Sequence, residues 1–487
     1  MEKELIIGKY TLESLTNGMY SSPLDMYREY IQNSVDSFDD IIESGIDIEN
    51  KLHIDIRVNE ADRSIVIRDN GTGIRSIEAT SRLLDIGNSH KSHNLSRGFR
   101  GIGRLAGLSY CDKLTFRTSY QGECICTIIE FDAKLLKELL LPGSSDNVTV
   151  EEVISRIVTV KEQKEKISSR YFEVKLENVD SGSGLTDYDN VQDYLLQHAP
   201  IPFSKNFKWN RVVLGKTRLN GFSIPQYKIS LNGNELVKPY TDSFVSDRIR
   251  KNTDEIQDIV VECFSIENEL SAVLWYAQTN YYGTVIDNST KGIRIRQGNI
   301  LIGDKTSCNH LFKEERFNGW MLGELHILDK RIIANSRRDG FEKNKYYYSL
   351  VEQLRDWALD VSKSIRHLSY ERSLTKAKKE IIESETLDEI DGFSDIYSDD
   401  SSYLEDFGES EMMNYGESEG LAETDYITKL ENLLNKKKWQ TKYTALNINE
   451  KLTIEQRKVL ERVFDIITQE YSRKSADRFI STISKCF

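Results

Sequence analysis

A set of polar side chains near the start of the chain is spaced to share one face of a helix. Positions i, i+4, i+7 and i+11 fall on one side of an α-helix, and here they are Glu29, Asn33, Asp36 and Asp40. A carboxylate and an amide on one face offer a general base and an oxygen ligand for a hard cation. Acidic residues on the solvated face of a surface helix need no function, so this spacing alone establishes no site.

A second candidate site is the segment Asp69-Asn-Gly-Thr-Gly73, which follows a short apolar run at 64–68. A carboxylate at the end of a strand accepts a hydrogen bond from an exocyclic amine. The glycines let the backbone approach a planar base without a Cβ in the way. The alternative interpretation is an ordinary Asn-Gly turn, which is common.

A third candidate site is the glycine-rich segment Gly98-Phe-Arg-Gly-Ile-Gly103, which leads into an apolar stretch through Leu108. A glycine-rich turn that opens a helix presents unpaired N–H groups and a positive dipole end to phosphate oxygens. The segment also imitates a dinucleotide-binding fingerprint. That fingerprint requires a preceding strand, whereas residues 83–97 are polar, so we predict a phosphate lid.

The elements that must position these residues follow from the hydrophobic pattern. We predict a helix over 22–44, with Pro23 in its first turn and an end near Gly45. Alternating apolar residues at 52–58 and a short run at 65–68 predict a hairpin. Further strands are expected at 113–119, 124–131 and 171–177, which makes the first 200 residues a mixed α/β sandwich.

Composition indicates a multidomain protein without a membrane anchor. The chain has 487 residues, 39% of them hydrophobic, enough for two or three domains. We find neither a run of about eighteen apolar residues nor a secretion signal at the start, so we predict a cytoplasmic location and no membrane association. The six cysteines show no CxxC pair, which argues against a zinc site or a disulfide framework.

The net charge of −13 is concentrated in one stretch. Residues 383–425 hold sixteen Asp and Glu and no Lys or Arg, so the rest of the chain carries a net charge of +3. We interpret this stretch as a disordered linker. The overall acidity therefore does not exclude a basic groove for nucleic acid.

The order of an ExxxNxxD helix, a DxGxG turn and a GxxGxG lid resembles the GHKL superfamily. That superfamily includes ninety-kilodalton heat-shock chaperones, MutL-type mismatch-repair proteins, type II topoisomerases, MORC proteins and histidine kinases. REYIQNSVDSFDDI at 28–41 looks like the chaperone helix, and GFRG at 98–101 is similar to the mismatch-repair family. GIGRLA at 101–106 is similar to bacterial chaperone-like ATPases. The resemblance implies a Bergerat-type α/β sandwich followed by a βαβ-containing transducer domain and a helical tail.

The resemblance also implies ATP with Mg²⁺ as cofactors and a role for each motif residue. Glu29 would be the general base that activates the attacking water. Asn33 would bind Mg²⁺ through its side-chain oxygen, Asp36 would support that site, and Asp69 would hold the adenine amino group. The residues expected to shape the base pocket or wrap the phosphates are Gly71, Gly73, Lys91, Gly98, Arg100, Gly101, Ile102 and Gly103.

A departure from the family pattern concerns the adenine pocket. The superfamily usually places a Thr on a later strand beside the adenine-binding Asp. The corresponding run here, Tyr171-Phe-Glu-Val-Lys-Leu176, contains no Thr. What completes the adenine pocket is therefore left open.

The second domain resembles the chaperone middle domain more faintly, over 319–341. In that family an Arg near the end of this stretch reaches the γ-phosphate. The counterpart here is Arg337, with Arg338 beside it and Lys291, Arg294 or Arg296 as further candidates. The alternative is a solvated basic loop.

These inferences predict a domain order and a function. The expected parts are an ATP-binding domain at 1–200, a transducer domain at 201–345, a helical segment at 346–382, the acidic linker at 383–425 and a helical region at 426–487. We expect a slow ATPase that works as a homodimeric clamp on a client protein or DNA. The alternative is a scaffold that binds ATP, hydrolyses little and signals to a partner, such as a nuclease, encoded in the same operon. A role in bacterial defence against phage is left open by the family context.

Overall fold

The computed structural model describes most of the chain up to residue 388. The described residues are 8–16, 20, 22–43, 52–85, 103–141, 148–247 and 251–388. The chain divides into two compact units, Met1–Ser369 and Tyr370–Phe487. The first unit holds both large sheets. Of the second unit, the structure describes the helical residues 370–388.

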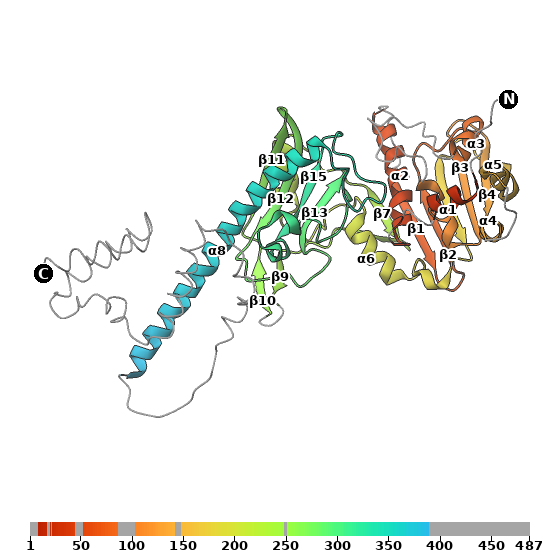
Figure 1. Ribbon diagram of the computed structural model, residues 1–487. Helices are drawn as coiled ribbons and strands as arrows, with labels where there is room; N and C mark the ends of the chain where they lie inside the picture. The colour runs from red at the N-terminus through yellow and green to blue at the C-terminus, as the bar shows by residue number, and fades with distance from the viewer. Residues whose placement is uncertain are drawn as a thin grey trace. The chain divides into compact units, whose positions relative to one another are not determined.

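The first large sheet has eight strands in the order β5-β4-β3-β6-β2-β1-β7-β8. Figure 1 labels β1, β2, β3, β4 and β7 of this sheet. Neighbouring strands are antiparallel except β1 and β7, which run parallel. The strands are β1 (His53–Asn59), β2 (Ser64–Asp69), β3 (Lys113–Ser119), β4 (Ile125–Asp132), β5 (Val158–Lys164), β6 (Tyr171–Glu177), β7 (Lys228–Leu231) and β8 (Asn234–Glu235). The predicted hairpin is confirmed, since β1 pairs with β2 and Ile56 lies opposite Ile67.

One face of this sheet packs against helices, and the alternation of the strands explains why. In β1 the side chains of Ile54, Ile56 and Val58 are buried, whereas Arg57 is exposed. A single apolar core joins these strands to residues of the covering helices. The helices of this part are α1 (Tyr10–Thr16), α2 (Asp25–Glu43), α3 (Ser76–Leu84), α4 (Ala133–Leu140), α5 (Val150–Ile157) and α6 (Tyr188–His198), with 3₁₀ helices η1 (Gly103–Leu105), η2 (Leu108–Tyr110) and η3 (Ser181–Ser183).

The second large sheet has five strands in the order β11-β12-β15-β13-β14 and a helix on each face. Leu274 of β12 belongs to the apolar cluster that α8 completes, and its neighbour Trp275 belongs to the cluster that contains Val213 of α7. The strands are β11 (Asp258–Ile266), β12 (Glu269–Gln278), β13 (Gly292–Gln297), β14 (Ile300–Leu301) and β15 (Leu322–Ile327). The other elements are α7 (Asn210–Leu219), α8 (Lys345–Asp388), η4 (Asn309–Leu311), η5 (Glu315–Trp320) and the small hairpin β9 (Ser243–Ser246) and β10 (Asn252–Glu255).

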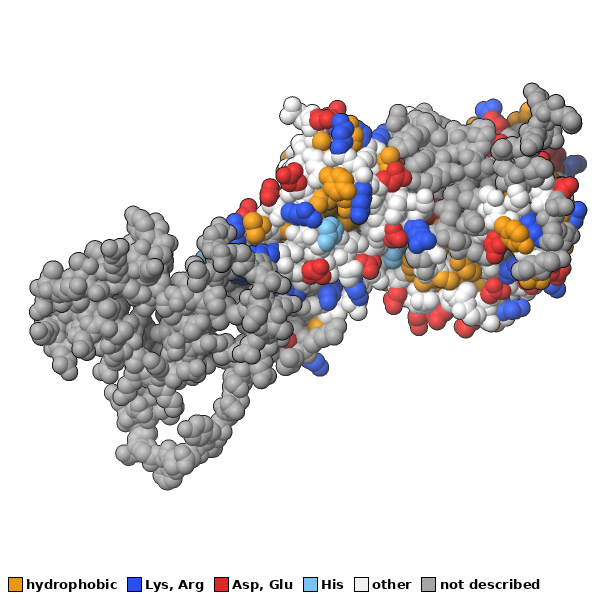
Figure 2. Space-filling model, in the orientation of Figure 1, with side chains coloured by type: hydrophobic (Ala, Val, Ile, Leu, Met, Phe, Trp, Pro, Cys, Tyr) orange, Lys and Arg blue, Asp and Glu red, His pale blue; other side chains and the backbone are white. Residues whose placement is uncertain are grey.

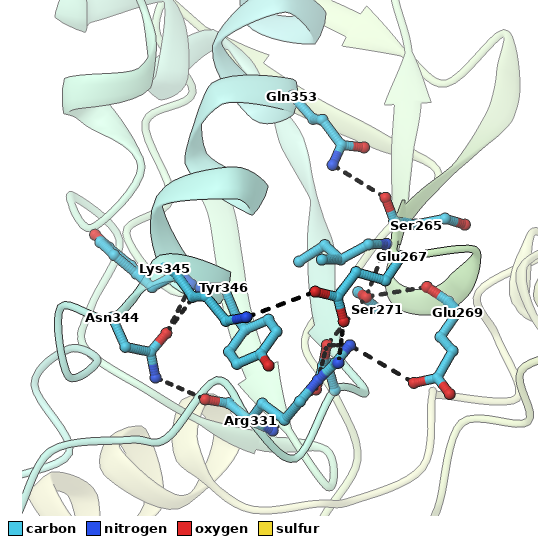
Figure 3. A network of polar contacts seen from close by, with 12 residues as sticks. Ser265, Glu267, Glu269, Ser271, Arg331, Asn344, Lys345, Tyr346 and Gln353 are labelled. Atoms are coloured by element: carbon cyan, nitrogen blue, oxygen red, sulfur yellow. Dashed lines mark hydrogen bonds and ion pairs between the residues drawn. The ribbon is translucent and has the colours of Figure 1, made fainter.

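Polar contacts around Arg331 fix the start of α8 against the turn between β11 and β12 (Figure 3). The Arg331 guanidinium pairs with Glu267 at 2.7 Å and with Asp329 at 2.8 Å. It also lies 4.1 Å from the ring centre of Tyr346, in the first turn of the helix. Lys345 adds a longer contact to Glu267, at 3.7 Å. Exposed ion pairs contribute little stability singly, so this network mainly sets the direction of the helix.

The elements depart from the expected boundaries at two places. The sheet of the first part continues past residue 200, because β7 pairs with β1 and β8 pairs with β7. The helix expected at 346–382 runs from Lys345 to Asp388 and so enters the acidic stretch. The parallel strands β13 and β15 are joined by a crossover that contains β14, η4 and η5. The region expected at 426–487 lies outside the described residues.

Candidate functional site

Three of the four residues on the predicted polar face of α2 are partly or fully buried. Tyr27, Ile31, Val35 and Phe38 pack into the core on the other side of the helix. The side chain of Glu29 is only 12% exposed. Asp36 is buried and Asn33 is half-buried, whereas Asp40 is exposed. The helix is therefore no ordinary surface helix with a solvated acidic face.

The carboxylate of Asp69 is buried at the end of β2 and is bound to α2. The hydroxyl of Ser34 donates to its Oδ2 at 2.6 Å, and the backbone N–H of Gly71 donates to its Oδ1 at 2.9 Å. Burial raises the pKa of Asp69, and the hydrogen bonds from Ser34 and Gly71 act in the opposite direction. The structure thus brings the first two sequence motifs together at one hydrogen bond.

The turn after Asp69 needs its two glycines. A Cβ at Gly71 would lie 2.3 Å from the Ser37 hydroxyl oxygen. Gly73 has a φ of +65°, and a Cβ there would lie 2.0 Å from the carbonyl oxygen of Ser119. The hydroxyl of Ser37 accepts the N–H of Thr72 at 2.9 Å. The backbone of this turn is therefore packed closely against α2 and β3, and only glycine fits at both positions.

Thr118 is a residue near this turn that the sequence analysis missed. Phe172 of β6 is the pairing partner of Asp69. Thr118 lies one strand further on, opposite Phe172, and is 1% exposed. Its hydroxyl accepts the N–H of Ile74 at 2.8 Å and donates to the carbonyl of Tyr171 at 3.3 Å. Only the strand order reveals this Thr, because β3 and β6 are far apart in sequence.

Gly103 is the one predicted lid residue that the structure describes. A Cβ built on it would lie 2.4 Å from Oε2 of Glu29, so the start of η1 touches the carboxylate directly. The backbone of the glycine-rich segment, at Gly103, is therefore in contact with Glu29 of the helical motif. The other predicted phosphate-binding residues, Lys91, Gly98, Arg100, Gly101 and Ile102, lie outside the described residues.

Two arginines connect the helix α2, which packs on the first sheet, with the loop 334–341, which follows the second sheet. Nη2 of Arg28 donates to the carbonyl oxygen of Arg337 at 3.2 Å. Nε of Arg338 lies 3.4 Å from Oε1 of Glu29, and the Arg338 side chain is 10% exposed. The side chain of Arg337 is exposed. The structure thus places the guanidinium of Arg338 beside Glu29, whereas Arg337 contributes its backbone carbonyl to this contact.

The conformation of the loop explains which of the two arginines points to α2. Arg338 has a φ of 55°, in the left-handed region. Its N–H donates to the carbonyl of Asn335 at 3.1 Å, and its own carbonyl accepts the N–H of Gly303 at 2.9 Å. These bonds fix a tight turn on the second sheet.

Arg296, another sequence candidate for the γ-phosphate contact, is used in a buried cluster around Glu324 instead. Its Nε donates to Glu324 at 2.6 Å, and Lys238 donates to both carboxylate oxygens of Glu324, at 2.8 and 2.6 Å. Although burial raises the pKa of Glu324, Arg296 and Lys238 hold it well below its ordinary value. Arg294 is also buried and donates to the carbonyl of Asn288.

A cation at this site would have Asn33 as its ligand from α2. Asn33 offers one amide oxygen on the same helical face as Glu29. In the part of the chain that the structure describes, no group of three or more His, Cys, Asp or Glu could hold a metal ion. Mg²⁺ commonly takes one or two protein ligands and completes its shell with phosphate oxygens and water.

A comparison with protein families agrees with this geometry. Residues 24–150 match the family model described as "Histidine kinase-, DNA gyrase B-, and HSP90-like ATPase". The matched span contains Glu29, Asn33, Asp69 and Gly103, and it supports the GHKL superfamily and ATP binding for this part of the chain. The mixed sheet with its covering helices is consistent with a Bergerat-type fold. No curated protein matches the chain. Across the described residues, no helix has the length and hydropathy to cross a bilayer.

Proposed function

We propose that the chain is a slow, Mg²⁺-dependent ATPase in which Glu29 is the general base. The observation that supports this most directly is the position of the Glu29 carboxylate. One of its oxygens faces the backbone of Gly103, and the other faces the guanidinium of Arg338. A base for hydrolysis has to lie where the phosphate lid and the cation that balances the γ-phosphate meet.

The buried carboxylate of Asp69 is the proposed anchor for adenine. It is an acceptor without a donor of its own, and Ser34 and Gly71 already fix its orientation. The exocyclic amine of adenine supplies the complementary donor. The turn through Gly71 and Gly73 would then lie beside the base, and its glycines let it pack closely against Ser37 and Ser119.

The phosphate end of the ligand is assigned to α2 and the lid. Asn33 would hold Mg²⁺, which supplies charge neutralisation at the phosphates, and Asp36 would support Asn33 from one turn further along α2. The N–H groups of the glycine-rich lid would bind the phosphate oxygens. The lid residues proposed for this task are Lys91, Gly98, Arg100, Gly101, Ile102 and Gly103.

The second domain completes the site in this proposal. The sequence favours Arg337 as the γ-phosphate contact, and the geometry supports its neighbour Arg338, whose guanidinium is the one beside Glu29. A second contact runs in the other direction, from the Arg28 side chain of the first domain to the Arg337 carbonyl of the second. This contact supports a cycle in which nucleotide binding and the position of the second domain depend on each other. In this proposal the coupling drives a chaperone-like cycle in which a dimer clamps a client protein or DNA.

Binding and turnover measured on the full chain test the proposal. We expect wild type to bind a fluorescent ATP analogue in the presence of Mg²⁺ and to release phosphate slowly. Glu29→Ala should keep the affinity and lose about 10²- to 10⁴-fold in turnover, as for removal of a general base. Asp40→Ala, on the exposed end of the same helical face, is the matched control and should turn over like wild type.

Two outcomes would count against this assignment. Full turnover by Glu29→Ala would remove Glu29 as the base. Tight ATP binding by wild type with negligible turnover would support the nucleotide-gated scaffold instead.

A further inference from the structure

The guanidinium of Arg28 lies beside three polar groups, and two of them are within hydrogen-bond distance. Its Nη1 lies 3.2 Å from Oδ1 of Asp25, and its Nη2 donates to the carbonyl of Arg337. Its Nε lies 3.6 Å from Oε1 of Glu29, beyond hydrogen-bond distance. Arg28 is 5% exposed, so these contacts operate away from bulk water, where electrostatic interactions are stronger. The orientation of one planar group therefore links Glu29 to the second domain.

Tyr194 fixes the carboxylate on which this orientation depends. Its hydroxyl donates to Oδ1 of Asp25 at 2.9 Å, and this is the oxygen that also faces Arg28. The other oxygen of Asp25 accepts the N–H of Ser22 at 3.2 Å. Tyr194 and Asp25 are both buried. Asp25 thus accepts hydrogen bonds from the Ser22 backbone, just before α2, and from the Tyr194 side chain of α6, beside its contact with Arg28.

The helix that carries Tyr194 is itself attached to the second sheet. The ring of Tyr194 stacks on His198 with centroids 3.9 Å apart and planes 6° from parallel. The carbonyl of Gln197 accepts a hydrogen bond from Nη2 of Arg296 at 2.9 Å. Arg296 in turn binds the buried carboxylate of Glu324. A shift of the second sheet would therefore move the end of α6 and, with it, the Tyr194 hydroxyl.

We propose that Tyr194 is a positioning residue for ATP hydrolysis, acting through Asp25 and Arg28 on Glu29. In this arrangement α6 transmits the position of the second sheet to the general base. Tyr194 touches neither nucleotide nor water in the reaction. The inference rests on the proposed ATPase activity and adds a residue that no sequence motif marks, because Tyr194 lies 169 residues from Asp25.

The expected defect is in turnover rather than in affinity. Tyr194→Phe removes one hydroxyl and keeps the ring that stacks on His198. Loss of that donor weakens the hold on Oδ1 of Asp25 and, with it, the orientation of Arg28 relative to Glu29. The proposed adenine and phosphate contacts lie elsewhere, so KM should stay within about twofold, whereas kcat should fall on the order of tenfold, as for small misplacements of a catalytic group.

The control is a second tyrosine on the same helix. The hydroxyl of Tyr188 contacts Gln192 and Asn234, at 3.4 and 3.2 Å, away from Asp25. Tyr188→Phe should leave kcat and KM at wild-type values. Thermal unfolding of each full-length variant, followed by circular dichroism, establishes that both are folded at the assay temperature.

A double-mutant cycle with Arg28→Lys separates positioning from a general loss of structure. Lysine keeps the positive charge, but it lacks the planar guanidinium and so cannot contact the three partners of Arg28 together. If Tyr194 acts through Arg28, Tyr194→Phe should add nothing to the loss in kcat that Arg28→Lys causes alone. Independent, multiplicative losses would overturn the proposal, and so would wild-type kcat in Tyr194→Phe or an equal loss in Tyr188→Phe.

Failure of this inference differs from failure of the ATPase proposal. If wild type hydrolyses ATP, Glu29→Ala does not, and Tyr194→Phe matches wild type, only the role of Tyr194 is lost. If wild type itself neither binds nor hydrolyses ATP, the proposed activity fails and the inference falls with it.

Discussion

Nε of Arg338 lies 3.4 Å from Oε1 of Glu29. Glu29 lies on α2, beside the first large sheet, whereas Arg338 lies in a loop of the second sheet, more than 300 positions later. A buried contact of this kind gives the loop 334–341 a defined place over α2. The contact also separates two adjacent arginines by role, since Arg338 points to the carboxylate and Arg337 is exposed.

Replacing the two arginines one at a time tests this difference. In Arg338→Ala the charge that develops on the γ-phosphate would lose a preorganised cation, so kcat should fall on the order of 10²-fold with KM little changed. Arg337→Ala should cost far less, because its contribution at this contact is a backbone carbonyl. Lysine at 338 should restore only part of the rate. Steady-state phosphate release measures all three. An equal loss in both alanine variants, or a larger one in Arg337→Ala, would return the role to Arg337.

Asp69→Asn should abolish ATP binding while the protein stays folded. An Asn amide presents donors of its own, so it cannot accept from Ser34, Gly71 and an adenine amine together. Titration with a fluorescent ATP analogue measures the loss, and a thermal unfolding scan verifies the fold. Asp62→Asn, in the exposed turn between β1 and β2, is the control. Unchanged affinity in Asp69→Asn would remove this carboxylate from the pocket.

Gly103→Ala should reduce turnover by displacing the general base. The added Cβ would lie 2.4 Å from Oε2 of Glu29, so the carboxylate has to move by about an ångström to restore van der Waals contact. We expect kcat to fall on the order of tenfold or more. Gly182→Ala is the matched control, because a Cβ there meets nothing within 4 Å. Wild-type turnover in Gly103→Ala would show that Glu29 need not occupy this position.

The local parts of the site could be predicted from the sequence. The helical spacing of Glu29 and Asn33 and the turn after Asp69 are set by residues close in the chain, and the structure forms α2, β1 and β2 where the pattern indicates. The hydrogen bond from Ser34 to Asp69 was not foreseen, although both residues lie within the motifs. It depends on how α2 packs on β2.

The parts that the sequence did not reveal depend on long-range pairing. Thr118 reaches the turn at Gly73 only because β3 lies next to β6. The choice of Arg338 over Arg337 depends on a left-handed residue whose carbonyl is bound by Gly303. Spacing along one strand or helix contains no information on either contact.

Breaking the buried Glu324 cluster at the junction of the two sheets should strongly destabilise the protein. Glu324→Gln leaves Lys238 and Arg296 buried without their carboxylate, and breaking a buried pair in this way typically costs about 3–5 kcal/mol. Urea unfolding of the full chain measures the change. Glu269→Gln removes a carboxylate that is 77% exposed and should cost less than about 1 kcal/mol. Equal effects of the two substitutions would contradict a central role for Glu324.

The stability of the protein should fall as the pH drops from about 6.5 to about 4, in part because of His198. Burial lowers the pKa of His198 from its ordinary 6.5 to about 4. Between these pH values the unfolded chain binds a proton that the folded protein does not. The free energy of unfolding therefore increases as the pH rises through this range and decreases as the pH falls. The difference between 6.5 and 4 corresponds to about 3 to 4 kcal/mol. Urea unfolding at pH 7, 6 and 5 should show a smaller decline for His198→Gln than for wild type, with His53→Gln as the control for loss of an exposed imidazole. A decline as steep in His198→Gln as in wild type would assign the acid sensitivity to other groups.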